Sequence, residues 1–438
     1  MAGTGQDERA AWQPIAEGAL AARIHAAVAE LAVALGARLD QAAERAPGDH
    51  AADGRTGTRA EQHAQHALLR AYLASAMADE AHADAALDSL DRAIEALATA
   101  ALRPSLHGGF AGIAWVADHV QEMLGVAGDD GNAGIDAALI RMVDAGPWPF
   151  GHDLIAGLAG IGVYALARVH RPGGVALLGR VVASLDEMSE NHGEDACFFT
   201  RPEWLSPAWR ARYPQGFHEL GMAHGTPGVI AFLARAHATG QAGARAAPLA
   251  RAATRWLLGQ RSGPARARGQ GDGGYFPARL APAAEPATAL AWCSGDAGVA
   301  LALLGAGRCL DERAWIETAL ALARAVATRP GQIALVVDAG LCHGAAGLAH
   351  LFQRWFQVTG EALFRDAALA WLERTLDLRT PGAGIAGYRS RGQASASAAI
   401  EWQDDPSLIH GASGIALALL AAVAPVEPAW DRLFLADL

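Results

Sequence analysis

The chain reads LCHGAAGLA from Leu341 to Ala349, and its two glycines, three positions apart, are the clearest copy of a pattern that recurs along the 438 residues. In each copy the second glycine is followed by an apolar residue and then by a small or apolar one. The six copies begin at Gly109, Gly157, Gly225, Gly295, Gly344 and Gly411. They are roughly 50 or 70 residues apart, which indicates one supersecondary unit used several times.

The segments between these copies have helical periodicity and are of two kinds. Amphipathic segments precede the motifs, at 84–101, 175–190, 246–259, 312–329 and 361–378. Shorter, nearly all-apolar runs follow the motifs, at 113–124, 161–169, 229–235, 299–304, 348–356 and 415–422. A helix that is apolar all round is buried, whereas a helix with a polar stripe is exposed on one side. The alternation therefore predicts an outer helix, a motif and an inner helix in each repeat.

Repetition of this unit predicts an all-α fold. Stacked in a line, these units would form a solenoid. Six to seven helical hairpins can instead close into an α/α toroid, in which a ring of inner helices lies within a ring of outer ones. Two N-terminal segments, 16–36 and 60–77, are expected to supply another hairpin. We expect one domain over residues 1–438, with an N-terminal helical segment and linker in 1–60 and the motif-bearing repeats in 106–420.

The composition excludes several other classes of protein. Apolar residues make up 52% of the chain and aromatic residues only 6%, too few aromatics for a typical sandwich or barrel of strands. A net charge of −11 argues against a nucleic-acid partner, which calls for a basic surface. Asp296 and Arg308 interrupt the apolar stretch 289–310, so no membrane span is expected. The polar N-terminus lacks a secretory signal, and only four cysteines are present, which favours a cytoplasmic location.

Three polar inserts stand out, at 191–220, 262–286 and 380–407. Each lies just before a glycine motif, and insertions at one phase of a repeat project from one face of the fold. The cysteines and histidines beside the motifs share that phase. The inserts are therefore expected to surround a pocket formed by the motif loops, where binding residues are commonly found.

Cys293, Cys342 and His343 are the strongest candidates for a functional site. Two thiolates and one imidazole suit Zn²⁺, and three protein ligands leave a fourth tetrahedral position open, as in a catalytic zinc site. A zinc ion with two thiolate ligands would bind and activate a third thiol, which points to chemistry on sulfur. The alternative is a pair of buried small hydrophobes beside a hydrogen-bonded histidine. The matching repeat phase of the cysteines favours zinc. Of the other cysteines, Cys309 is interpreted as a core residue and Cys197 as a free thiol rather than a ligand.

His224 lies at the same repeat phase as the histidine of the zinc candidates but has no cysteine beside it. An imidazole that faces the same cavity without binding metal is a natural general acid or base. Asp153, ahead of the second motif, could orient such an imidazole, and Asp338 could do the same for the metal-binding histidine. His107 and His410 are candidate cavity residues, but a solvent-facing or capping role fits them equally well.

Three segments together resemble the lanthionine cyclase family: Trp292-Cys293-x-Gly295, Cys342-His343-Gly344, and Ala223-His224-Gly225-x-Pro227-Gly228. The similarity extends from about residue 106 to about residue 420. It implies a toroid of inner and outer helices with a zinc ion at its centre. It also implies that Cys293, Cys342 and His343 bind the metal, that His224 is the catalytic acid or base, and that Asp153 is a second active-site residue.

The reaction implied by this resemblance is an intramolecular Michael-type addition. A cysteine thiolate of a modified precursor peptide adds to a dehydroalanine or dehydrobutyrine of the same peptide, and a thioether ring forms. The implied partners are the dehydrated precursor peptide and a separate dehydratase. The implied alternatives are addition of glutathione or another small thiol to dehydrated peptides, and a non-catalytic, peptide-binding role in a lanthipeptide biosynthetic complex.

The chain departs from the family pattern at two positions. Well-known members carry an arginine four residues before the first zinc cysteine and a tyrosine directly after it, where this chain has Ala289 and Ser294. Arg266, Arg268 and Tyr275, in the insert just upstream, are candidates to replace them.

Overall fold

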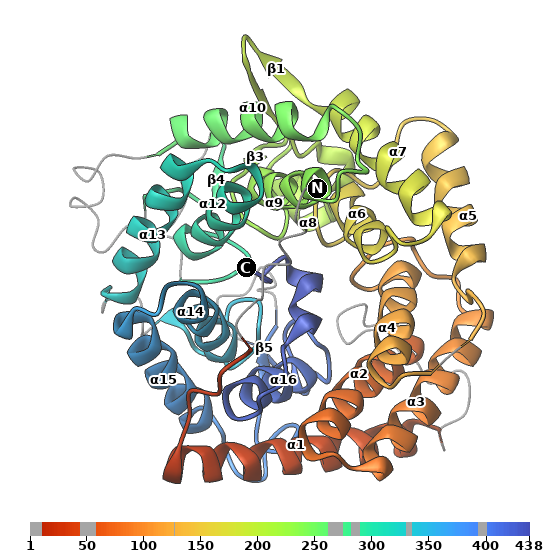
Figure 1. Ribbon diagram of the computed structural model, residues 1–438, viewed down its shortest axis with the longest axis vertical. Helices are drawn as coiled ribbons and strands as arrows, with labels where there is room; N and C mark the ends of the chain where they lie inside the picture. The colour runs from red at the N-terminus through yellow and green to blue at the C-terminus, as the bar shows by residue number, and fades with distance from the viewer. Residues whose placement is uncertain are drawn as a thin grey trace, which may run out of the picture.

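The computed structural model describes residues 11–43, 58–126, 128–261, 275–281, 290–329, 335–392 and 401–438. Its helices form two concentric rings (Figure 1). The inner ring comprises α2 (Arg59–Met77), α4 (Phe110–Met123), α6 (Leu158–Ala167), α9 (Thr226–Ala238), α12 (Asp296–Leu310), α14 (Ala345–Thr359) and α16 (Ala412–Val423). The outer ring comprises α1 (Gly18–Ala43), α3 (Glu80–Thr99), α5 (Ala133–Asp144), α7 (Pro172–Met188), α10 (Ala246–Gly259), α13 (Arg313–Ala327) and α15 (Ala362–Asp377). The predicted α/α toroid is confirmed.

One outer helix, α5, was not expected from the sequence. Gly131 and Gly134 flank and interrupt its start, and only three of its residues are buried, so its amphipathic pattern is weak. The buried residues are Asp136, Leu139 and Val143. Asp136 accepts hydrogen bonds from the buried Arg168 guanidinium, so this helix is held partly by an ion pair rather than by an apolar stripe.

The expected N-terminal hairpin is wrong, because α1 packs mainly on α16 while α2 packs on α3. The first outer helix of the chain thus covers the last inner helix and closes the rings (Figure 1). Trp12, just before α1, donates its indole N–H to the carbonyl of Ala421 at 2.8 Å. Among the described residues, α1 is the one helix long and apolar enough to cross a membrane, and 33% of that stretch is buried. A core helix passes the same test, so α1 does not establish a membrane span.

The glycine motif is explained by close packing at the start of each inner helix. The first glycine is the N-cap residue in all six copies. A Cβ atom on the second glycine would overlap the carbonyl oxygen of the residue six positions earlier. The pairs are Gly112 with Leu106, Gly160 with Leu154, Gly228 with Met222, Gly298 with Trp292, Gly347 with Leu341 and Gly414 with Leu408. The loop before each helix therefore folds back onto its first turn, and only glycine leaves room for it.

The six motif loops are joined into a ring by hydrogen bonds from each loop to the next. The bonds run from the N–H of His107 to the carbonyl of Ile155 (3.1 Å), Leu154 to Ala223 (3.1 Å), Ala223 to Cys293 (3.2 Å), Cys293 to Cys342 (3.2 Å) and Cys342 to Ile409 (2.9 Å). The residues just before the glycines are thus held at equivalent positions around the centre of the toroid.

The seventh inner helix, α2, has no glycine motif, and two of its side chains complete the ring. Gln65 accepts the N–H of Leu408 on Oε1 at 2.9 Å, and Glu61 accepts the N–H of Gly108 on Oε1 at 3.0 Å. The amide of Gln65 donates to Glu61 at 3.1 Å, which links the last motif loop to the first.

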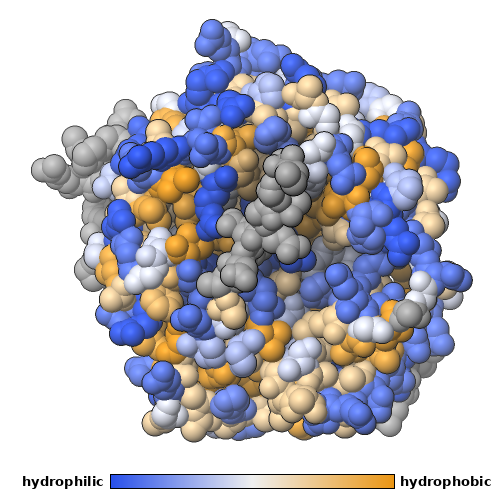
Figure 2. Space-filling view, viewed as in Figure 1, coloured by the Kyte–Doolittle hydropathy of each residue, from blue (hydrophilic) through white to orange (hydrophobic). Residues whose placement is uncertain are grey.

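The polar inserts contribute three two-stranded antiparallel ribbons. They are β1 (Glu190–His192) with β2 (Asp195–Cys197), β3 (His218–Glu219) with β4 (Arg279–Leu280), and β5 (Ser390–Arg391) with β6 (Trp402–Gln403). The first insert also contains η1 (Pro202–Trp204) and α8 (Pro207–Arg212). In Figure 1, β1 projects from the outer edge of the ring beside α10, so this insert also reaches the periphery. Figure 2 shows hydrophilic residues over much of this face, with apolar side chains between them.

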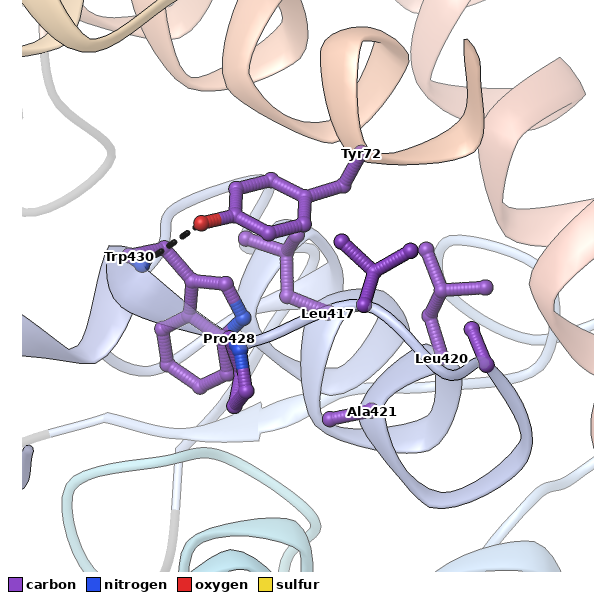
Figure 3. A pocket seen from close by; sticks show the side chains of 8 residues that line it. Tyr72, Leu417, Leu420, Ala421, Pro428 and Trp430 are labelled. Atoms are coloured by element: carbon purple, nitrogen blue, oxygen red, sulfur yellow. Dashed lines mark hydrogen bonds between the residues drawn. The ribbon is translucent and has the colours of Figure 1, made fainter. Parts of the chain in front are cut away.

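The C-terminal segment lies inside the ring (Figure 1), where η3 (Ala429–Phe434) packs against the motif loops. Its carbonyl groups at Phe434 and Leu433 accept from Trp292 Nε1 at 3.1 Å and pair with His107 Nε2 at 3.2 Å. Figure 3 shows its contact with α2, where the N–H of Trp430 donates to the Tyr72 hydroxyl at 2.9 Å. The apolar cavity there measures ≈ 10 Å³, room for about one water molecule, and is a packing gap rather than a ligand site.

Candidate metal centre and acid-base pair

The three predicted zinc ligands come together in the structure. Cys293 lies in the loop before α12, and Cys342 and His343 lie in the loop before α14. Their sulfur and nitrogen ligand atoms lie within 4.8 Å of one another. Ligand atoms around a tetrahedral zinc are about 3.5–3.8 Å apart, so small side-chain adjustments would close the set on an ion. Cys342 and His343 precede the N-cap and are not helical, which lets two adjacent side chains face the same point.

The electrostatics of this cluster suit a cation. A hydrogen bond from Cys342, opposed by burial and supported by His343, holds the pKa of Cys293 well below the usual thiol range. The same contact, together with burial, raises the pKa of Cys342. Burial lowers the pKa of His343, but hydrogen bonds with Asp338 and Cys293 outweigh it and raise the value to about 10. These opposite shifts mark groups that share protons, and a cation that binds here displaces protons from its ligands.

Asp338 lies directly behind the histidine of this cluster. Its Oδ2 is 3.5 Å from His343 Nε2 and accepts the N–H of Arg391 at 2.9 Å, while Oδ1 accepts the N–H of Gly340 at 3.3 Å. These bonds fix the carboxylate before any metal binds. Burial would raise the pKa of Asp338, but the bond to His343 lowers it. A carboxylate in this place orients a metal-binding imidazole.

His224 and Asp153 form a second pair in the neighbouring loops. Asp153 Oδ2 accepts from His224 Nδ1 at 2.8 Å, while Oδ1 accepts the N–H groups of Ala156 and Gly157 at 2.7 and 2.9 Å. Burial disfavours a charged imidazole here, but the carboxylate of Asp153 outweighs it and raises the pKa of His224 to about 9. Although it is enclosed by the ring, the His224 side chain is 55% exposed, so a substrate can reach it.

The other histidines near the motif loops stay neutral. Burial lowers the pKa of His107, His152 and His410 to about 4. The His410 ring lies 5.3 Å from that of His343, and His107 binds the C-terminal segment. These residues shape the interior of the ring, whereas His224 and His343 carry its exchangeable charge.

Glu219 is an acidic residue near the His224–Asp153 pair that the sequence analysis missed. It lies six positions before the first glycine of its motif, as Asp338 and Asp405 do in theirs. Its buried carboxylate pairs with Arg279 at 3.1 Å, and its charge also helps to raise the pKa of His224. Burial raises the pKa of Glu219 itself. The recurrence of an acidic residue at this position was the signal that could have revealed it.

Of the residues that concern the two departures from the family pattern, the structure describes Ser294 and Tyr275. Ala289, Arg266 and Arg268 lie outside the described residues. Ser294 Oγ lies 4.0 Å from the sulfur of Cys293. Tyr275 donates its backbone N–H to Asp296 at 2.9 Å.

Two concentric helical rings with a Cys-Cys-His cluster and a His-Asp pair in the central loops define an α/α toroid with a candidate metal centre. The sequence matches the family described as Lanthionine synthetase C-like protein over residues 66–435, so the chain belongs to this family. Among solved structures it is similar to nisin cyclase, with a TM-score of 0.69 and 18% sequence identity over 94% of this chain and 97% of that chain. At this identity the likeness concerns the fold. The family expected from the motifs is confirmed.

Proposed function

We propose that this protein is a zinc-dependent cyclase that forms thioether rings in a dehydrated precursor peptide. Its family membership supports the reaction class. The observation that carries the proposal is the pairing of two sites in adjacent motif loops. One is the Cys293, Cys342 and His343 cluster, and the other is His224 hydrogen-bonded to Asp153. The first set of side chains suits thiol activation and the second suits proton transfer.

Cys293, Cys342 and His343 would hold the zinc ion. When bound, zinc supplies Lewis acidity that lowers the pKa of a substrate thiol, ordinarily about 8.5, so that thiolate prevails at neutral pH. Asp338 accepts from the His343 ring and holds it in one orientation. The two thiolates would offset the charge of the ion, and a neutral imidazole would complete the set of protein ligands.

His224 is the residue that moves a proton in this mechanism. Because Nδ1 is bound to Asp153 and the pKa is about 9, Nε2 carries a proton at neutral pH. The substrate thiol loses its proton, its sulfur bonds to the β-carbon of the dehydrated residue, and the α-carbon needs a proton. His224 Nε2 donates that proton and is reprotonated by the one that the thiol released. No atom is gained or lost, so the ring product has the mass of the linear peptide.

The substrate in this proposal is a peptide that carries both a cysteine and a dehydrated serine or threonine. A separate dehydratase would supply it. A small thiol such as glutathione would use the same groups, and its adduct would be heavier by the mass of the thiol. The chemistry of the site does not distinguish the two thiols, but the product does.

The test uses a model peptide with one dehydroalanine and one cysteine. The peptide is incubated with the zinc-loaded protein, treated with an alkylating reagent and weighed by mass spectrometry. We expect a product of unchanged mass that resists alkylation, formed faster than in a sample without protein. With glutathione present, a heavier adduct would instead support small-thiol addition. Thiols that remain fully alkylatable, with no adduct, would refute both reactions and leave a peptide-binding role.

A further inference from the structure

A second cluster of metal-type side chains lies away from the motif loops. The ligand atoms of Glu190, Cys197 and His218 lie within 4.8 Å of one another, and none of these residues belongs to the central cluster. Glu190 and Cys197 are paired directly across the β1–β2 ribbon, so their side chains share one face. His218 starts β3, which lies next to β2 because Thr200 and Phe217 form a bridge.

The buried part of this cluster contains a free thiol and a ring nitrogen without a hydrogen-bond partner among the described residues. Cys197 is fully buried and forms no disulfide. His218 has a buried Nδ1 with no hydrogen-bond partner among the described residues, although buried polar atoms are normally paired. The rings of Phe199 and Trp256, 5.0 and 5.2 Å away, hold the imidazole between them. Glu190 is solvent-exposed and gives an ion a path from solution.

We propose that Glu190, Cys197 and His218 form a second binding site for a zinc-class divalent cation. Thiolate sulfur, imidazole nitrogen and carboxylate oxygen are the three ligand types that zinc accepts, and the two anionic groups balance its charge. The proposal gives Cys197 a ligand role, whereas the sequence alone favoured a free thiol. This proposal is independent of the proposed catalytic activity.

The placement of the site indicates a structural role. The ion ties the β1–β2 ribbon to β3, and the residue after His218 on β3 is Glu219, whose carboxylate raises the pKa of His224. β2 also packs on α10 of the outer ring (Figure 1). A bound ion therefore joins the peripheral ribbon to the strand that leads into the loop of His224. Binding to the folded state alone stabilises it by mass action.

The experiment is a titration of metal-free protein with Zn²⁺ against a chromophoric chelator. The wild-type protein is expected to bind two equivalents, and Cys197→Ser and Cys342→Ser one each. Cys309→Ser, at the cysteine that belongs to neither cluster, is the matched control and should still bind two. One equivalent in the wild type, retained by Cys197→Ser, would overturn the proposal. One equivalent that Cys197→Ser loses and Cys342→Ser retains would support this site and overturn the central one.

Cys197 is buried, so Cys197→Ser could lose zinc simply by misfolding. Glu190→Gln changes an exposed ligand of the same site and should leave the fold intact. Its second equivalent should bind at least about tenfold more weakly, since even partners outside the coordination sphere contribute that much to affinity. Co²⁺ gives an independent measurement: Cys342→Ser should retain a thiolate-to-cobalt absorption band that the double variant with Cys197→Ser lacks. A Glu190→Gln titration that superimposes on the wild type, or identical cobalt spectra for the single and double variants, would contradict the site.

Discussion

The loops before α9 and α14 share one backbone plan but carry different chemistry. In both, a histidine directly precedes the first glycine: His224 in one loop and His343 in the other. The residue before that histidine is Ala223 in the first loop and Cys342 in the second, and its N–H bonds to the next loop in both. The backbone thus places an imidazole at the same point of each repeat. The neighbouring side chain determines whether it sits in a metal cluster or, paired with Asp153, is suited to carry a proton.

The largest expected effect comes from removing a metal ligand. Cys342→Ala should abolish central zinc binding and slow cyclisation by about 10³-fold or more, because a metal contributes several kcal/mol to such a reaction. Zinc content and alkylation-protected product report the two losses. Cys309→Ala, outside the cluster, should change neither. If Cys342→Ala cyclises at the wild-type rate, the chemical difference between the loop of His343 and the loop of His224 has no role in the reaction.

A change in the other loop should separate proton transfer from metal binding. His224→Gln should retain zinc but slow cyclisation by about 10²–10⁴-fold, the usual contribution of a general acid or base. If the two loops have different roles, a change at His224 should lower the cyclisation rate without lowering the zinc content, whereas loss of a metal ligand beside His343 should lower both. Loss of zinc from this variant would show that His224 supports the metal centre instead.

A subtler change tests how the acid-base histidine is tuned. Asp153 raises the pKa of His224 to about 9, so the acid form is present at neutral pH and is lost as pH rises through about 9. Protonation of His224 also stabilises the folded state. This contribution to stability is complete below the pKa of the unfolded chain, about 6.5, and is lost as pH rises through about 9. In Asp153→Asn the alkaline fall in activity should move toward the ordinary value, with zinc content unchanged. A pH profile that coincides with the wild type would rule out this tuning.

The helical ring and the candidate metal ligands could be predicted from the sequence, because both depend on local sequence patterns. Six glycine pairs mark six of the seven inner helices, and Cys293 and Cys342 share a repeat phase. What the sequence could not show depends on contacts between distant segments. Glu219 acts on His224 only because β3 lies beside the loop of that histidine, and its carboxylate pairs with Arg279 from a distant insert. The partner of α1 could not be predicted either, since α1 packs mainly on α16, which lies at the other end of the sequence and comes beside it only when the ring closes.

The smallest expected effect concerns the closure at α2, where side chains replace the loop-to-loop backbone bonds that both histidine loops rely on. Gln65→Leu removes the acceptor of the Leu408 N–H and leaves it buried without a partner, which should destabilise the fold by about 1–3 kcal/mol. Chemical denaturation at a fixed zinc concentration measures this loss. Gln41→Leu, at an exposed position on α1, should stay within about 0.5 kcal/mol of the wild type. Because Gln65 bonds to neither histidine loop, zinc affinity and cyclisation rate should remain near the wild-type values in both variants. Equal stability of the two variants would mean that the ring of loops holds its shape without closure, whereas a loss of zinc affinity in Gln65→Leu would mean that strain at the closure reaches the metal loops.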